Sequence, residues 1–146
     1  MPTSTPVDRW SRPHGPVTSE LCVRLATLLN DFNPAHYDHD FAMEIGMPGV
    51  IAPGTLLQGW IATDVTERFG WSAAAPDRPR LRGIDLRFTS PVFLNEHILI
   101  DYDWQADRAA LTITASPEPG ADGRTVATGT VRVAAEETTR TGAHHG

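Results

Sequence analysis

A helix that is apolar around most of its circumference, followed by four runs of alternating residues, largely determines the fold class of this chain. The helix is predicted over residues 55–69, and its first two turns are apolar nearly all round, so it has to be covered on most sides. The runs that follow alternate apolar and polar side chains, which is the period of a strand with one wet face. They lie at 84–88, 98–104, 111–115 and 127–133. We therefore predict an α+β fold in which an antiparallel sheet wraps around a long central helix.

Composition limits the class of protein and its partners. A length of 146 residues suits one domain with its own core. The net charge of −6 argues against a nucleic-acid or membrane-surface partner, which would favour a basic face. The single cysteine, Cys22, excludes an internal disulfide and is expected in the core. No apolar run approaches the roughly 20 residues of a membrane span, and prolines interrupt the start of the chain where a signal peptide needs an apolar core. We expect a cytoplasmic protein.

The ends of the chain differ in composition from its middle. Residues 1–16 are rich in proline and are predicted to form a flexible N-terminal arm, with a short strand near 7–10. Residues 137–146 are polar and rich in Gly, Thr and His, and are predicted to be a disordered tail. The domain is therefore expected to span 17–136.

Two shorter helices are predicted before the apolar one. Leucines at helical spacing indicate a helix over 18–30, and Thr18 is a suitable N-cap. A second helix is predicted over 38–45, with Asp38 or His39 near its cap. The segment between these two helices therefore has to turn within a few residues.

That connecting segment carries an acid and an imidazole. Asp31 and His36 are five positions apart, and Asn33-Pro34 between them breaks the helix and turns the chain. Such a turn can bring both side chains to one side, where they can act as a general acid/base pair. Gly54 opens the apolar helix, so its backbone N–H lies at the positive end of the helix dipole and can stabilise a developing oxyanion. Without further context, the same residues are a turn acid, a surface histidine and a turn glycine.

These features resemble the MaoC-like acyl-thioester hydratases, which have the hotdog fold. The resemblance covers about residues 18–133, and the matching positions are Asp31, Asn33, Pro34, His36, Asp38, Ala42, Gly46, Gly54 and the run Arg87-Phe88-Thr89-Ser90-Pro91-Val92. Two positions depart from the family pattern. The family usually has histidine where this chain has Pro53, and it often has glycine where this chain has Asn30.

The resemblance implies a reaction and a site. It implies a hydro-lyase that hydrates 2-enoyl thioesters, linked to coenzyme A or a carrier protein, or dehydrates 3-hydroxyacyl thioesters. Asp31 and His36 would be the catalytic pair and the Gly54 N–H the oxyanion donor. No metal or redox cofactor is expected, since coenzyme A or phosphopantetheine belongs to the substrate. The resemblance also implies a homodimer, or a heteromer with another hotdog chain.

Five further residues are candidates for substrate binding. Asn33 is placed with them, although bracing the turn through its side chain is its main expected role. Trp60 and Phe88 are candidates for an acyl tunnel, with core packing as the alternative for Trp60. Arg80 and Arg82 belong to a small basic cluster that suits the phosphates of coenzyme A or a carrier protein, with a solvated strand edge as the alternative.

Other functions within the same fold stay open at this point. The chain can be the catalytic subunit of a heteromeric hydratase of lipid, steroid or polyketide metabolism, an alternative that the Pro53 departure favours. It can be a non-catalytic acyl-thioester-binding protein, although a protein of that kind has no need of an acid/base pair. A thioesterase would place its acid on the long helix, where Asp64 and Glu67 are available. The histidines lack metal-ligand spacing, so no metal site is predicted.

Overall fold

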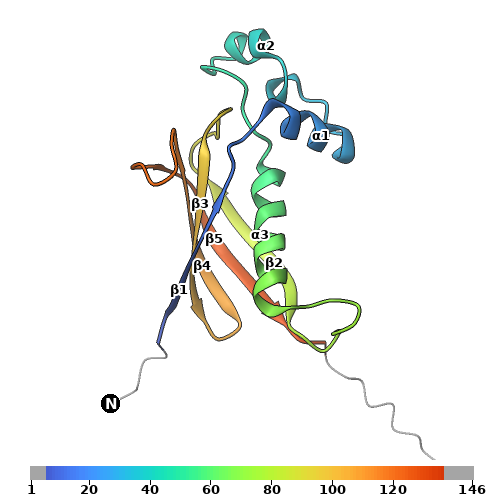
Figure 1. Ribbon diagram of the computed structural model, residues 1–146. Coiled ribbons are helices and arrows are strands. Elements are labelled where there is room, and N and C mark those ends of the chain that lie inside the picture. Colours follow the sequence, from blue (N-terminus) through green and yellow to red (C-terminus); the bar gives the residue numbers. More distant parts are fainter. Residues whose placement is uncertain (1–5, 137–146) are drawn as a thin grey trace, which may run out of the picture.

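A long helix, α3 (Gly54–Phe69), lies in the concave face of a five-stranded antiparallel sheet (Figure 1). The computed structural model describes residues 6–136. The strand order is β1-β3-β4-β5-β2, with bounds β1 Asp8–His14, β2 Arg80–Phe88, β3 His97–Gln105, β4 Arg108–Ser116 and β5 Arg124–Ala134. The predicted α+β fold, with a sheet around a central helix, is therefore confirmed.

The alternating runs form the strands because their apolar side chains all point to one face. In β3 the inward side chains are Ile98, Ile100, Tyr102 and Trp104, and all four are buried. They belong to one core with side chains of β4, β5 and the inner face of α3. The core therefore lies between the sheet and the helix, as the period of the runs predicts.

The prediction of a flexible arm over residues 1–16 is wrong for residues 8–14. These residues form β1, which pairs antiparallel with β3 from Asp8↔Trp104 to His14↔Ile98. Trp10 packs against Tyr102 with ring centroids 5.0 Å apart. The short strand predicted near 7–10 is present and extends to His14. The sequence does not indicate its full length, because most of its inward side chains are polar and find their partners on α3. Residues 1–5 and the predicted tail at 137–146 lie outside the described residues.

The main polar partner of β1 is Asp64, a fully buried carboxylate in the middle of α3. It accepts hydrogen bonds from the Tyr102 hydroxyl at 2.7 Å and from Arg12 Nε at 3.2 Å, and it lies 2.8 Å from His14 Nε2. Burial and the neighbouring Asp64 carboxylate raise the pKa of Tyr102 well above its ordinary value, so its hydroxyl keeps its proton and donates. This network fixes β1 and β3 to α3.

The opposite side of α3 is open in this chain. The sheet covers only the helix side that carries Leu57, Ile61 and Val65, whereas Thr55, Gln58, Gly59, Thr63 and Thr66 are exposed. The expectation that the helix is covered on most sides is therefore wrong for the single chain. The exposed side carries small and uncharged residues for most of its length.

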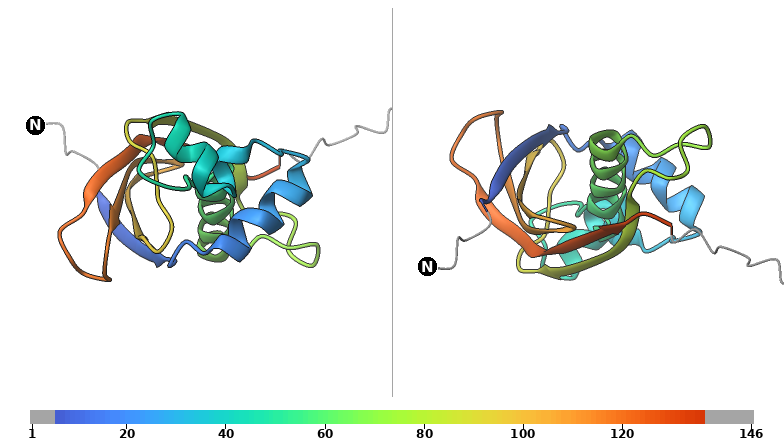
Figure 2. Two further views of the ribbon diagram at one scale, coloured as in Figure 1. Left: turned by 90° about the horizontal axis from the view of Figure 1, so that it is seen from above. Right: turned by 90° about the horizontal axis from the view of Figure 1, so that it is seen from below.

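Three short helical segments cover the N-terminal end of α3 (Figure 2). They are α1 (Ser19–Leu29), the 3₁₀ helix η1 (Pro34–His36) and α2 (His39–Glu44). The predicted N-caps are present: Thr18 accepts from the Leu21 N–H and Asp38 accepts from the Phe41 N–H. Because η1 joins α1 to α2 at the end of α3, the Asp31–His36 turn lies close to the helix N-terminus.

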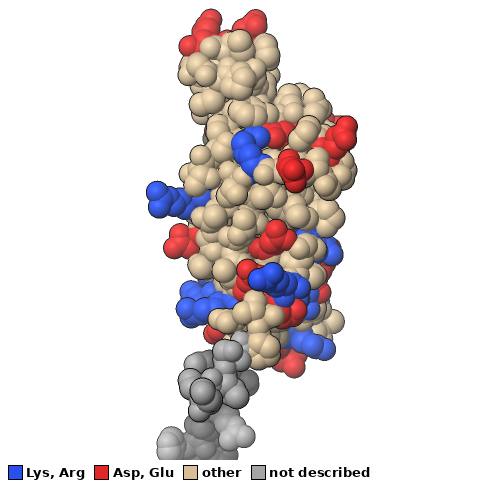
Figure 3. Space-filling view, turned by 90° about the vertical axis from the view of Figure 1, so that its left-hand side faces the viewer, with Lys and Arg blue, Asp and Glu red and all other residues tan. Residues whose placement is uncertain are grey.

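The side of the molecule that lies to the left in Figure 1 carries both basic and acidic side chains. They are interspersed over its lower part, whereas its upper end shows acidic side chains alone (Figure 3). Among residues 6–136, no helix has both the length and the apolar character required to cross a bilayer.

Candidate active site

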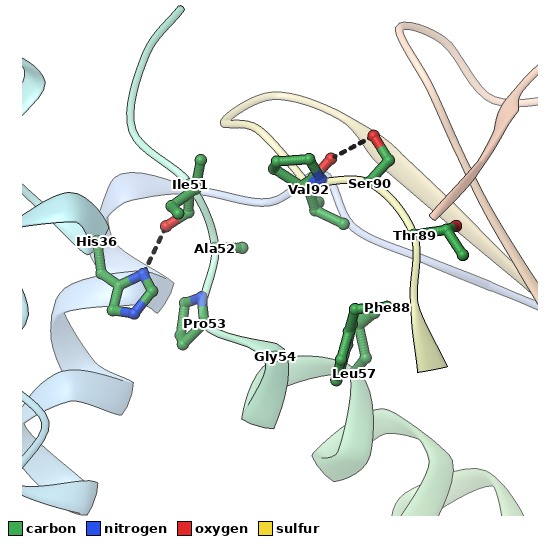
Figure 4. A pocket seen from close by; sticks show the side chains of 11 residues that line it. His36, Ile51, Ala52, Pro53, Gly54, Leu57, Phe88, Thr89, Ser90 and Val92 are labelled. Atoms are coloured by element: carbon green, nitrogen blue, oxygen red, sulfur yellow. Dashed lines mark hydrogen bonds between the residues drawn. The ribbon is translucent and has the colours of Figure 1, made fainter. Parts of the chain in front are cut away.

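A cavity of about 490 Å³ lies at the N-terminus of α3, between η1 and the end of β2. Its lining is mostly apolar and consists of His36, Ile51, Ala52, Pro53, Gly54, Leu57, Phe88, Thr89, Ser90, Pro91 and Val92. In Figure 4, His36 lies on one side of the helix N-terminus and Phe88 on the other, with Pro53 and Gly54 between them. The cavity therefore combines an apolar wall, an imidazole and a helix N-terminus.

The hydrogen bonds of His36 define its tautomer. Its Nδ1 lies 2.8 Å from the carbonyl oxygen of Ile51, which can only accept (Figure 4). Nδ1 therefore carries the proton, and in the neutral ring Nε2 presents a lone pair. Nε2 lies 3.8 Å from the Asp31 carboxylate. The structure thus brings together the two residues that the sequence motif pairs, with Asp31 just outside the cavity lining.

Local hydrogen bonds explain how the short stretch from Asp31 to His36 brings these two side chains together. Asn33 accepts from the Ala35 N–H at 3.1 Å, which caps η1 and leaves the Asn33 side chain outside the cavity lining. Asp31 accepts from the Asn33 N–H at 3.3 Å. The Ile51 N–H donates to the Ala35 carbonyl at 3.0 Å, which fixes the segment before α3 against η1. Asn33 therefore braces the turn, and the structure gives it no contact with the cavity.

Gly54 is the first residue of α3, and no acceptor for its N–H is present among the described residues. Its N-cap, Pro53, makes no side-chain hydrogen bond to the helix. The Phe88 ring packs directly on Gly54, since a Cβ added there would lie 2.8 Å from Phe88 Cζ. Glycine at this position therefore permits the close approach of the ring and leaves an N–H free at the positive end of the helix.

Three of the predicted substrate-binding residues lie away from this cavity. Trp60 stacks on His14 at 5.0 Å on the side of α3 where β1 packs. Arg80 is at the opposite end of β2 from Phe88, roughly 26 Å along the strand, and it pairs with Glu136. Arg82 is exposed on the same strand and does not line the cavity. Only Phe88 of the predicted tunnel and phosphate residues borders the cavity.

The sequence motif missed most of the cavity wall. The family resemblance includes the run Thr89–Val92 but implies no role for it at the site. A strand that ends in Ser-Pro has to turn there, and this turn brings the segment against α3. The residues that hold the segment in place, Glu96 and Arg124, carry no local signal.

The long-helix acids are unsuited to the thioesterase alternative. Asp64 is fully buried and already bonded to three side chains. Glu67 pairs with Arg12 on the surface. Within residues 6–136, no three His, Cys, Asp or Glu side chains are grouped as metal ligands.

Comparison with known proteins identifies the family. A model of the MaoC-like domain matches residues 5–109. The structure is similar to the (R)-hydratase from A. caviae involved in PHA biosynthesis, with a TM-score of 0.67 and 21% identity over 89% of this chain and 96% of that one.

Two further solved structures share the fold. The R-hydratase PhaJ1 from Pseudomonas aeruginosa has a TM-score of 0.69 and 19% identity, over 90% of this chain and 81% of that one. A chain of the ChsH1-ChsH2 complex from Mycobacterium tuberculosis has a TM-score of 0.65 and 16% identity, over 93% of this chain and all of that one (100%). No curated protein sequence gives a significant match. The family match and the shared architecture establish that this chain belongs to the MaoC-like dehydratase domain family and has the hotdog fold.

Proposed function

We propose that this chain catalyses the reversible hydration of 2-enoyl thioesters, with Asp31 and His36 as its acid/base pair. The observation that carries the proposal is the arrangement of two hydrogen-bond acceptors. Since Nδ1 of His36 is occupied by the Ile51 carbonyl, Nε2 faces the Asp31 carboxylate at 3.8 Å. One water molecule can donate a hydrogen bond to each of these groups while its lone pairs stay free for attack.

The proposed reaction adds one water across the double bond. The water oxygen bonds to C3 of the enoyl group while one member of the pair takes its proton. Electron density moves through C2 to the thioester oxygen, where the free N–H of Gly54 stabilises the negative charge. A proton is then delivered to C2, which restores the thioester. Dehydration of a 3-hydroxyacyl thioester is the same path in reverse, and water and thioester supply every atom.

The shape of the cavity supports an acyl substrate. Leu57, Phe88 and Val92 provide apolar side chains beside the helix N-terminus, which is where the reacting carbons would lie. The phosphates of coenzyme A or a carrier protein would remain outside, since Arg80 and Arg82 lie away from the cavity. We therefore propose that the cavity selects the acyl group and contributes little to recognition of the carrier.

A second hotdog chain is part of the proposal. Helix α1 and the turn that follows it, near the N-terminus of α3, expose large apolar side chains, among them Leu28 at 81% and Phe32 at 59%. Exposed apolar patches of this kind are typical of surfaces that meet another protein chain. The alternative to a homodimer is a catalytic subunit of a heteromeric hydratase. It is favoured by Pro53, which gives this helix N-terminus no side-chain cap, and by the similarity to a chain of the ChsH1-ChsH2 complex.

The test is loss of enoyl-thioester absorbance over a panel of acyl lengths and bulky acyl groups. Asp31→Asn and His36→Ala are each expected to lower kcat/KM by about 10²–10⁴-fold. His39→Ala is the matched control, since His39 is an exposed histidine of the neighbouring helix outside the cavity, and it is expected to keep full activity. Full activity in both site variants would contradict the proposal. Release of free thiol would identify hydrolysis instead of hydration.

A further inference from the structure

The wall of the cavity opposite His36 is a single connecting segment between β2 and β3. Its residues Thr89, Ser90, Pro91 and Val92 all line the cavity. The segment has few backbone hydrogen bonds of its own and makes no regular secondary structure. Its position therefore depends on contacts from elsewhere in the fold. The Val126 carbonyl of β5 accepts from the N–H groups of Thr89 and Ser90.

Arg124, the first residue of β5, makes the side-chain contacts that hold Ser90 and Pro91. Its guanidinium donates to the Ser90 hydroxyl at 2.8 Å and to the Pro91 carbonyl at 2.6 Å. It also donates to both oxygens of the Glu96 carboxylate, each at 2.8 Å, and it lies over the Phe93 ring at 5.3 Å. All five donors of a guanidinium lie in one plane, so this set of acceptors fits arginine and not lysine.

Glu96 holds the C-terminal end of this segment. Its carboxylate accepts the Phe93 N–H at 2.8 Å in addition to Arg124, and its side chain is only 12% exposed. Burial raises the pKa of Glu96, but the hydrogen bonds from Arg124 and Phe93, with the Arg124 charge, together lower it below 4.5. The carboxylate is therefore ionised and paired with Arg124 at neutral pH. Because Glu96 is nearly buried, this pair differs from exposed surface pairs, which contribute little to stability.

The segment in turn contacts residues 51–52, which precede α3 and orient His36. The Val92 carbonyl accepts the Ala52 N–H at 2.7 Å, and Phe93 forms a β-bridge with Ile51. The Ile51 carbonyl is the acceptor for His36 Nδ1. Arg124 is therefore connected to the imidazole by three hydrogen bonds, at Pro91, Val92 and Ile51, which adjacent peptide units of the backbone join.

We propose that Arg124, paired with Glu96, is a positioning residue of this site. It sets the place of the apolar wall and, through Ala52 and Ile51, the orientation and tautomer of His36. Its effect on turnover rests on the proposed function, whereas its effect on His36 does not. Arg124 holds two lining residues, Ser90 and Pro91, but is not itself a lining residue and does not touch the reacting atoms.

The test compares Arg124→Gln and Glu96→Gln with Arg108→Gln in the full chain. Arg108 is a suitable control because its pair with Asp107 is exposed and lies at the far end of β4 from the cavity. The readouts are ¹⁵N NMR shifts of the His36 ring, hydrogen exchange of the Ala52 amide, and kcat and KM for short and long enoyl thioesters. Circular dichroism identifies the variants that remain folded.

The wild type and Arg108→Gln are expected to show a single His36 tautomer with the proton on Nδ1. Arg124→Gln is expected to show a mixture of tautomers and faster Ala52 exchange. Its kcat is expected to fall by about 10- to 100-fold, with a smaller change in KM. Glu96→Gln is expected to show the same changes at reduced size, since glutamine still accepts the Phe93 N–H, and it carries the test if Arg124→Gln does not fold.

Two outcomes are distinguishable. A folded Arg124→Gln or Glu96→Gln protein with the wild-type His36 shifts and wild-type Ala52 exchange would overturn the positioning role, whatever its activity. If instead the wild type hydrates none of the thioesters while both readouts change as expected, the proposed function fails and the positioning role stands.

Discussion

At the scale of single residues, backbone atoms decide what the site side chains can do. The imidazole of His36 is directed by one carbonyl oxygen, that of Ile51, and the proposed oxyanion donor is one N–H, that of Gly54. The Ile51 carbonyl and the Gly54 N–H are backbone groups, so replacing the side chain of either residue does not remove them. Substitution therefore acts on them only through geometry, and Gly54 offers the sharpest case.

Gly54→Ala is expected to reduce hydration strongly while the protein stays folded. The new Cβ would meet Phe88 at 2.8 Å, and the ring is half exposed, so it can swing away. The displaced ring and the added methyl both occupy the cavity in front of the Gly54 N–H. The measurement is kcat/KM for crotonyl thioester together with the thermal midpoint.

Gly59→Ala is the matched control in the same helix. A Cβ at this position meets nothing within 4 Å. Gly59 lies on the exposed side of α3, so the variants are compared at the same assembly state. There Gly59→Ala is expected to keep its activity and to gain about 0.5–1 kcal/mol in free energy of unfolding, because alanine restricts the unfolded chain and favours the helix. Equal activity in the two alanine variants would contradict the role given to the Gly54 N–H.

At the scale of elements, α3 is held to the sheet by a polar network as well as by apolar packing. Asp64 joins it to β1 through Arg12 and His14, and to β3 through Tyr102. A buried carboxylate with three partners adds stability only while the set is complete, since each partner left without an acceptor loses hydrogen bonds that water cannot replace.

Asp64→Ala is expected to lower the free energy of unfolding by about 3–5 kcal/mol. The physical reason is that Tyr102, which is fully buried, and Arg12 and His14, which are partly buried, then remain without their acceptor. Glu67→Ala removes an exposed acid from the same helix and is expected to cost about 0–1 kcal/mol. Urea denaturation measures the free energy of unfolding of both variants. Similar decreases in the two would contradict the claim that the buried Asp64 network stabilises the fold.

The pair of Glu96 and Arg124 predicts a pH dependence of stability. The folded pKa of Glu96 lies below its ordinary value of 4.5. Its contribution is therefore fully present above that value, and it is lost as pH falls through the folded pKa. The stability advantage of the wild type over Glu96→Gln is expected to be constant from pH 7 to about 5 and to shrink below 4.5.

Urea midpoints of the two proteins between pH 7 and pH 3 check this prediction. Glu20→Gln serves as the control, because Glu20 forms an exposed pair with Arg24 within α1. Its difference from the wild type is expected to stay small at every pH. An advantage that grew as the pH fell would refute the assignment of the shift to Glu96.

At the scale of the whole molecule, one chain leaves two surfaces uncovered. They are the exposed side of α3 and the apolar side chains of the segment that covers its N-terminus. The cavity lies at the N-terminal end of α3, which both surfaces adjoin, and we propose that a second chain covering them also completes the acyl site. Assembly and activity are therefore expected to change together.

The purified chain is expected to have the mass of a dimer in size-exclusion chromatography with light scattering. If it is a subunit of a heteromer, activity on long acyl thioesters is expected only after co-purification with its partner chain. A monomer that hydrates long acyl thioesters at full rate would contradict the assembly proposal.

The sequence alone determined those parts of the protein that depend on neighbours within a few positions. Strand alternation, helix caps at Thr18 and Asp38, and the Asp31–His36 turn follow from periods and hydrogen bonds that act over two to five residues. The family motif also indicates the acid/base pair and Gly54, because the residues that define each of them lie within a short stretch of sequence.

Only the tertiary structure decided the rest, because those contacts join residues that are far apart in the chain. Arg12 meets Asp64 across 52 positions, and this partner turns a polar N-terminal stretch into a strand. Arg124 meets Ser90 across 34 positions, and this contact builds the cavity wall. Trp60 and Arg80 were predicted to bind substrate but lie away from the cavity. The type of a side chain does not indicate which face of a helix, or which end of a strand, adjoins the cavity. That depends on register and packing, which are set by the whole sheet at once.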